Sequence, residues 1–267
     1  MSVVLQVIRE QLNHIDLIFR LALFEAKGKY QTHYLGVLWN IIQPLLVILT
    51  YWLVFGLGIR GGSPVGDTPY FVWLIAGLIP WLFISPSIVR GANSVYAKIS
   101  LVSKMNFPVS VLPAISIVGN MFDFLVMLLL QALILLVYRI NPGLYVLQLP
   151  YYMICTFVFL YAFTLLFSTM STIVRDVQSI LQSAVRMMLY LLPILWDVHR
   201  LPEMVVTVLK LNPFFYIITG FRQTFLGEGW FFEDPIYTIY FWVTTLFFLY
   251  LGSTLHMKFR HKFVDYL

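Results

Sequence analysis

The sequence predicts an all-α polytopic membrane protein with six transmembrane helices, because long apolar segments recur along a chain that carries few charges. Hydrophobic residues make up 60% of its 267 residues and charged residues 11%, with a mean hydropathy of +0.86. Crossing a bilayer takes about 20 mostly apolar residues in a helix, and each span has to satisfy its own backbone hydrogen bonds. No linker, repeat or low-complexity tract divides the chain, so we expect one transmembrane domain over residues 1–267.

The six expected spans follow one another along the chain with mostly short connections. The fifth is the shortest, and it holds an arginine, Arg186, within its apolar sequence. The spans are Val37–Gly58, Phe71–Val89, Ile115–Val137, Gln148–Thr169, Ile180–Trp196 and Ile236–His256.

Basic residues are distributed unequally between the two sides of these spans. With both ends of the chain on one side, that side holds eleven of the lysines and arginines, and the other side holds five. Because cytoplasmic connections are enriched in Lys and Arg, we expect a multi-pass protein of the cell (plasma) membrane with both termini in the cytoplasm. The same bias accounts for the formal net charge of +5, so the charge indicates no nucleic-acid partner.

Residues 1–29 predict an amphipathic helix that lies in the membrane interface, and they do not resemble a cleavable signal peptide. The polar face is too rich in charge for a span. The apolar face is formed by Leu5, Ile8, Leu12, Ile15 and Phe19.

Residues 197–235, between the fifth and sixth spans, predict a re-entrant segment. They contain an apolar run, Pro213–Phe225, that is too short to cross the bilayer. Pro202 and Pro213 each suit the first turn of a helix. We therefore expect two short helices that enter the outer leaflet and return.

No pattern in the sequence predicts catalysis by this chain. The five histidines are scattered, Cys155 is the single cysteine, and no G-x-x-x-x-G-K-[ST] or G-x-S-x-G motif is present. We expect no catalytic residue, no metal site and no cofactor in this chain. Ionisable residues within spans are functional candidates; here they are Asp123, close to Asn120, and Arg186. The alternative is that Asp123 hydrogen-bonds a neighbouring helix and Arg186 reaches the headgroups.

Three stretches resemble the membrane (permease) subunits of ABC exporters for polysaccharides and teichoic acids. The first, Phe24–Leu45, carries the motif residues Lys29-Tyr30, Leu35-Gly36, Trp39 and Gln43-Pro44. The second, Gly77–Pro113, carries Gly77, Pro80, Trp81, Asn93, Leu101, Val102, Lys104, Phe107, Pro108, Leu112 and Pro113. The third comprises Arg175-Asp176, Asn212-Pro213 and Arg222. The stretch Pro69–Trp81 is most similar to the teichoic acid exporters of Gram-positive bacteria. Leu192-Pro193-Ile194 departs from the family's usual Ser-Pro-Val or Ser-Pro-Ile.

The resemblance implies a fold like that of type II ABC exporters and a function that needs partners. It implies a homodimer associated with two copies of a separate ATP-binding subunit, which would hold ATP and Mg²⁺. The implied substrate is a polymer, teichoic acid above all, linked through pyrophosphate to an undecaprenyl lipid and moved from the cytoplasmic to the outer leaflet. The open alternatives are a drug or lipid exporter of the same fold, an ATP-independent secondary carrier or channel, and a membrane scaffold.

Coupling to the ATPase is expected at two cytoplasmic places. Residues 93–106 combine polar and apolar side chains, which predicts a short docking helix; the alternative is a helix lying on the membrane. Arg175 and Asp176 are neighbours in the loop between spans four and five. Because neighbouring helical positions point apart, we expect one to anchor the fifth helix and the other to meet the partner, the alternative being a topogenic arginine. The expected coupling residues are Lys98, Leu101, Val102, Lys104, Met105, Arg175 and Asp176.

Substrate contacts are expected from a basic cluster and from aromatic side chains. Arg20, Lys27 and Lys29 precede the first span and suit the lipid pyrophosphate, although ordinary anionic membrane lipids would attract the same cluster. Tyr51 and Phe55 lie four residues apart and so share a helix face, on which a sugar or polyol chain could slide. An interfacial aromatic belt is the alternative. The residues expected on the translocation path are Tyr51, Phe55, Trp73, Phe83 and Tyr190.

Overall fold

A computed structural model describes residues 3–31, 34–99, 107–198, 201–261 and 263, and it confirms the all-helical fold class. Within these ranges the only β-type pairing is an isolated bridge between Val65 and Thr68. The elements are α1 (Val3–Asn13), α2 (Ile15–Gln31), η1 (Gly36–Leu38), α3 (Trp39–Tyr51), η2 (Trp52–Ile59), α4 (Tyr70–Ala97), η3 (Val109–Val111), α6 (Leu112–Val137), η4 (Gly143–Gln148), α7 (Leu149–Ile173), α8 (Asp176–Leu191), α9 (Glu203–Lys210), α10 (Pro213–Leu226) and α11 (Pro235–Phe259).

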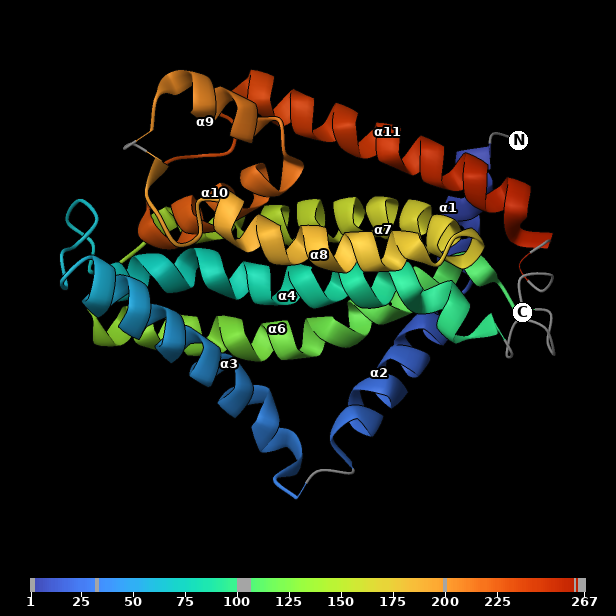
Figure 1. The fold of residues 1–267 in the computed structure, drawn as a ribbon, viewed down its shortest axis with the longest axis horizontal. Helices are drawn as coiled ribbons and strands as arrows, with labels where there is room; N and C mark the ends of the chain where they lie inside the picture. Colours follow the sequence, from blue (N-terminus) through green and yellow to red (C-terminus); the bar gives the residue numbers. More distant parts are fainter. Residues whose placement is uncertain (1–2, 32–33, 100–106, 199–200, 262, 264–267) are drawn as a thin grey trace.

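Helix α4 is the centre of the bundle. It contacts α6, α7, α8 and α10, and 78% of its most apolar window is buried, against 11% for the span formed by α3 and η2. Figure 1 shows α4, α6, α7 and α8 running alongside one another, with α11 outside α7. On the opposite side, α2 and α3 form a V whose two arms reach the bundle and whose point lies away from it. The weak burial of α3 therefore follows from its place at the edge.

Among the described residues, five helical segments are long and apolar enough to cross a membrane. They are Trp39–Ile59, Tyr70–Ala97, Val109–Val137, Gly143–Ile173 and Pro235–Phe259. The expected fifth span, Ile180–Trp196, is corrected in its bounds: α8 begins at Asp176 and ends at Leu191. Pro193 explains the early end, because proline disfavours a helical conformation in the residue before it. The 16 residues of α8 reach about 24 Å, which is shorter than a hydrocarbon core.

The segment between α8 and α11 folds as two short helices, as the sequence predicts. The axes of α9 and α10 meet at a bend of 103°. Asn212 caps α10 by accepting a hydrogen bond from the backbone N–H of Phe214 at 3.0 Å. The chain after α10 is fastened to the bundle by Gln148, whose Nε2 donates to the Gly229 carbonyl and whose Oε1 accepts from the Phe231 N–H.

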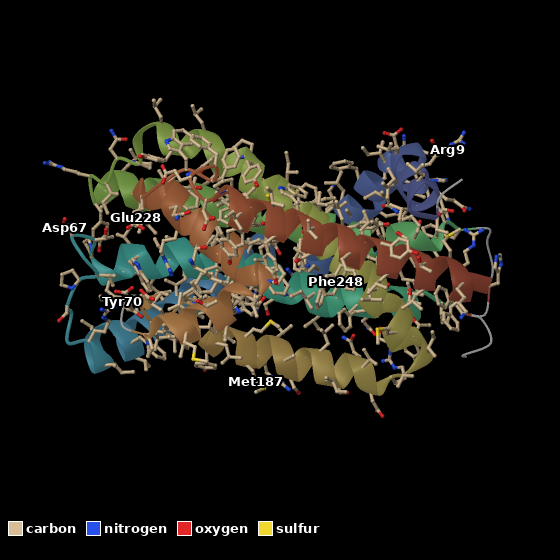
Figure 2. The ribbon with its side chains drawn as sticks, turned by 90° about the horizontal axis from the view of Figure 1, so that it is seen from above. Arg9, Asp67, Tyr70, Met187, Glu228 and Phe248 are labelled. Atoms are coloured by element: carbon tan, nitrogen blue, oxygen red, sulfur yellow. The ribbon has the colours of Figure 1, made fainter. Side chains whose placement is uncertain are left out.

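The N-terminal segment forms two helices where one was expected. The break falls at His14, whose Nδ1 lies 2.8 Å from the Glu10 carbonyl oxygen. Helix α1 contacts α11 and η3, whereas α2 lies along α6. Some polar side chains of this segment bond to the bundle: Gln11 donates to the Ser110 carbonyl oxygen at 3.0 Å, and Glu10 pairs with Arg260. Figure 2 places Arg9 at one end of the molecule and Asp67, Tyr70 and Glu228 at the other.

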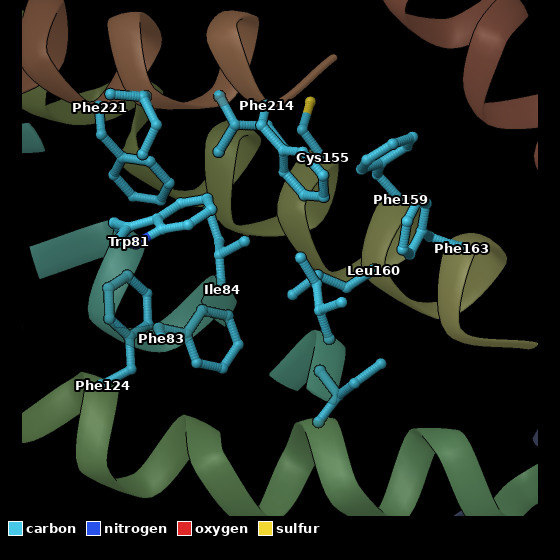
Figure 3. Packing of buried hydrophobic residues seen from close by; sticks show 14 of the residues in the cluster. Trp81, Phe83, Ile84, Phe124, Cys155, Phe159, Leu160, Phe163, Phe214 and Phe221 are labelled. Carbon is cyan, nitrogen blue, oxygen red and sulfur yellow. The ribbon is translucent and has the colours of Figure 1, made fainter. Parts of the chain in front are cut away.

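Aromatic rings fill much of the interior between α4, α6, α7 and α10. Phe83 stacks on Phe124 with ring centroids 4.6 Å apart, and Phe214 meets Trp81 and Phe159 edge to face. Figure 3 shows these rings meeting between the ribbons. Such edge-to-face and offset arrangements suit the quadrupoles of aromatic rings.

Glycines allow the closest helix approaches in this interior. A Cβ atom at Gly220 would lie 1.9 Å from a ring carbon of Tyr152, and one at Gly252 would lie 3.0 Å from the backbone nitrogen of Leu166. Close approach at small residues is a common means of packing helices in membranes. Gly220 thus joins α10 to α7, and Gly252 joins α11 to α7.

We predict that Gly220→Ala destabilises the folded protein by about 1–3 kcal/mol, the usual range for overpacking. The added methyl group has to displace the buried ring of Tyr152. Thermal unfolding in detergent checks this, with Gly28→Ala as the control because a Cβ there meets no atom within 4 Å. Equal unfolding midpoints for Gly220→Ala and the unmodified protein would contradict this packing.

Candidate functional site

Two polar residues on one face of α6 each meet a basic residue from another helix. Asn120 and Asp123 are three positions apart, so they lie on the same side of the helix. Arg90 of α4 donates to the Asn120 carbonyl oxygen at 2.9 Å, and the Asn120 amide donates to Ser87 at 3.1 Å. Lys29 of α2 forms an ion pair with Asp123. Asp123 therefore bonds a residue of a neighbouring helix, which was the alternative that the sequence analysis left open for it.

These groups line a cavity of about 150 Å³ between α2, α3, α4 and α6. Its polar lining comes from the two basic residues, one carboxylate and three amides, and most of the remaining lining is apolar. The lining residues are Lys29, Trp39, Asn40, Gln43, Pro44, Val47, Leu82, Pro86, Arg90, Asn120, Asp123 and Met127.

The ion pair at this cavity is partly shielded from the surroundings. The Lys29 side chain is 30% exposed and that of Asp123 is 16% exposed. Asp123 lies eleven residues beyond the start of α6, which is about 16 Å along the helix. A charge at such depth in a transmembrane helix is costly unless it is paired, so the pair stabilises the contact between α2 and α6.

A second cavity of about 380 Å³ lies between α3, α4 and α8. Tyr51 and Tyr190, both expected on the translocation path, line it together with Arg186. Arg186 is exposed and donates to the Ser183 hydroxyl at 3.2 Å. Phe55 contacts Tyr51, with ring centroids 6.2 Å apart. The rings of Tyr51 and Tyr190 and a guanidinium thus share one cavity, which Trp81 also lines.

Trp73 and Phe83, also expected on the path, lie instead in the packed interior. Trp73 is 5% exposed and Phe83 is 4% exposed. Arg222 of α10 lies over the Trp73 ring at 3.7 Å, and a Cβ at Gly77 would lie 2.5 Å from its guanidinium nitrogen. Neither ring lines the two cavities described above. Their place is explained by core packing and by a cation–π contact.

At the end of the bundle that carries α1, the expected coupling residues meet other parts of the same chain. Lys98 forms an ion pair with Glu25 of α2. Arg175 donates to Asn93 at 3.1 Å, and its guanidinium lies 3.5 Å from the ring centroid of Tyr96. Asn93 and Tyr96 lie in the last turns of α4. Residues 93–97 therefore continue α4 and do not begin the separate docking helix expected from residue 93 onward. The expected coupling residues Leu101, Val102, Lys104 and Met105 lie outside the described residues.

Asp176 is the exposed first residue of α8. A carboxylate at this position is favoured by the positive end of the helix dipole. The neighbouring Arg175 contacts α4, whereas the Asp176 side chain is exposed. Contact of either residue with a partner subunit stays a prediction.

The basic cluster expected for pyrophosphate is divided by the fold. Lys29 lies in the first cavity, while Arg20 and Lys27 are exposed on α2 and do not line it. Arg90 and Asn40 are cavity residues that the sequence interpretation did not select. Asn40 directly follows Trp39 of the first motif. No spacing in the sequence links Asn40 to Arg90, which lies on α4. Within the described ranges, no three His, Cys, Asp or Glu residues are grouped as a metal site would require.

Comparison with known proteins assigns the family. The pattern that defines the ABC-2 type transporter family matches residues 17–226. The O-antigen export system permease protein RfbA of Klebsiella pneumoniae is 28% identical over 253 residues, which cover 94% of this chain and 95% of that protein. A protein of the same name from Myxococcus xanthus is 27% identical over 223 residues, which cover 83% and 84% of the two chains. Because the family pattern extends over most of the chain, this protein belongs to the ABC-2 type transporter family.

Proposed function

We propose that this chain is the membrane subunit of an ATP-driven exporter that moves a lipid-linked polysaccharide from the cytoplasmic to the outer leaflet. The observation that carries the proposal is its similarity, over 94% of its length, to a permease named for O-antigen export. The family membership supports a transport role, and the ATP would be hydrolysed by a separate subunit. Two copies of each subunit form the proposed complex, with both termini of this chain in the cytoplasm of the cell.

The distribution of polar and aromatic groups is suited to such a substrate. A lipid tail can remain in the membrane beside α3, which is largely unburied. Tyr51 and Tyr190 offer ring faces for sugars in the larger cavity. For the lipid pyrophosphate, the basic residues Arg20, Lys27 and Lys29 remain the proposed contacts, with Lys29 at the smaller cavity.

Two polymers are candidates for the exported substrate. The relatives named for O-antigen export favour a polysaccharide. Teichoic acid, expected from Pro69–Trp81, is the alternative polymer, and both share attachment to a lipid through pyrophosphate. A drug or lipid exporter of the same fold would bind no polymer, and a secondary carrier would need no ATPase.

We predict that reconstituted complex hydrolyses ATP faster when a lipid-pyrophosphate-linked polysaccharide is added. The assay compares three additions to proteoliposomes that hold this chain and its ATPase: the linked polysaccharide, a lipid-linked polyol-phosphate polymer, and the prenyl lipid without polymer. Stimulation by the first and its movement across the bilayer support the proposal. Stimulation by the second alone assigns teichoic acid. Movement of polymer without the ATPase would contradict an ATP-driven exporter.

We also predict that Arg175→Ala lowers polymer-stimulated ATP hydrolysis more than basal hydrolysis. Arg175 joins the loop before α8 to Asn93 and Tyr96 at the end of α4, so its loss should weaken communication between the proposed ATPase contact and the spans. A loss of about two- to fivefold is expected, because an exposed cation–π contact contributes about 0.5–1 kcal/mol. Arg139→Ala, in the loop after α6, is the control. Equal loss in basal and stimulated rates would assign Arg175 a structural role only.

A further inference from the structure

The smaller cavity brings charged and amide side chains together in an apolar part of the molecule. Arg90 lies seven residues before the end of α4, about 10 Å along the helix, and Asp123 lies deeper still along α6. Burying polar groups in such surroundings costs free energy unless they find partners. The side-chain carbonyl oxygen of Asn40 is buried and has no hydrogen-bond partner. These features suit a cavity that receives a polar ligand.

The charges of the cavity leave a positive excess. Lys29 and Asp123 neutralise each other in their ion pair. Arg90 adds a further positive charge, and the one hydrogen bond that the described structure records for it goes to a neutral amide, that of Asn120. A guanidinium has five N–H donors and binds phosphate oxygens bidentately. An anionic ligand with several acceptor oxygens therefore fits the cavity better than a neutral one.

The size of the cavity favours a small group. Its volume of about 150 Å³ is less than half that of the cavity between α3, α4 and α8, about 380 Å³, and suits a phosphate or pyrophosphate group better than a polymer. Pro44, Val47 and Met127 belong to its apolar lining, and only 11% of the most apolar window of the span formed by α3 and η2 is buried. An apolar tail attached to the phosphate could therefore leave the cavity past α3.

We propose that this cavity binds the phosphate-bearing head group of a lipid, held by Arg90 and by Lys29, with Asp123 as its competitor. The head group and the Asp123 carboxylate are both anions that Lys29 can pair with. Binding of the head group draws Lys29 from Asp123, and departure of the head group restores the ion pair. The amides of Asn40 and Gln43 complete the hydrogen bonds. This inference deepens the proposed function, since a lipid-linked polymer carries such a phosphate, and its test needs neither ATP nor polymer.

The test measures equilibrium binding of farnesyl pyrophosphate to the purified full-length chain in detergent by native mass spectrometry. Arg90→Gln should raise the dissociation constant about tenfold, the effect of losing one charge-assisted contact. Asp123→Asn should lower the dissociation constant several-fold, because it removes the competitor of the ligand. Arg9→Gln is the matched control, since Arg9 is exposed on α1 outside the cavity.

The opposite signs distinguish a binding site from a structural ion pair. If the pair only stabilises the fold, Asp123→Asn weakens binding or leaves it unchanged, and the proposal is overturned. Equal effects of Arg90→Gln and Arg9→Gln would also overturn it. If Asp123→Asn lowers the unfolding temperature too far for binding measurements, Gln43→Trp decides: filling the cavity from the loosely packed α3 should abolish binding, and unchanged binding rejects the site.

Two further ligands identify the source of the phosphate. Farnesol tests the tail alone, and its binding should not respond to Arg90→Gln; an equal response would overturn the proposal. Phosphatidylglycerol tests an ordinary membrane lipid. A response to farnesyl pyrophosphate alone supports a prenyl carrier as the occupant, whereas a matching response to phosphatidylglycerol supports a membrane phospholipid in the same site. The site can fail this test while the reconstituted exporter moves polymer, so the two proposals fail separately.

Discussion

The ion pair between Lys29 and Asp123 is the interaction on which the arrangement of the N-terminal half depends. A carboxylate in the middle of α6 costs free energy when it has no partner, because hydrocarbon supplies none. Lys29 provides that partner from the end of α2, and the pair holds α2 along α6. The position of α2 in turn sets where α3 begins and leaves the polar cavity between these helices and α4. Because the pair is only partly buried, it determines the geometry of the contact between α2 and α6 more than it adds to the free energy of unfolding.

Much of the fold was predictable from sequence because the membrane imposes a simple length rule. Apolar runs of about 20 residues predicted the spans that the structure shows as α4, α6, α7 and α11. The rule is less informative where a helix is short: α8 stops before Pro193, which hydropathy alone does not detect. The division of the N-terminal segment at His14 was also missed, since an amphipathic pattern continues through the break. That break lets α2 run along α6 while α1 contacts α11 and η3.

The candidate site was predictable in part. Asn120 and Asp123 could be selected because polar residues three apart in an apolar helix share a face. Arg90 could not, because it was indistinguishable from the other basic residues that determine insertion. Aromatic composition was a weak guide: Tyr51 and Tyr190 do line a cavity, while Trp73 and Phe83 pack in the core. The direction in which an aromatic side chain points depends on which helices pack beside its own, and amino-acid composition carries no information on that packing. The expected docking residues between Leu101 and Met105 lie outside the described residues, so they remain predictions.

The placement of α2 on α6 is tested most directly by chemical cross-linking in native membranes. In a Cys155→Ser background, cysteines introduced by Ala22→Cys in α2 and Gly119→Cys in α6 leave the ion pair intact and should be joined by a short bifunctional thiol reagent, because a Cβ at Gly119 would lie 3.7 Å from the Ala22 carbonyl oxygen. The pair Phe24→Cys and Gly119→Cys is the control, because Phe24 is 75% exposed. We expect efficient cross-linking of positions 22 and 119 and little at 24 and 119. Equal cross-linking of the two pairs, or none at 22 and 119, would contradict the placement of α2 on α6.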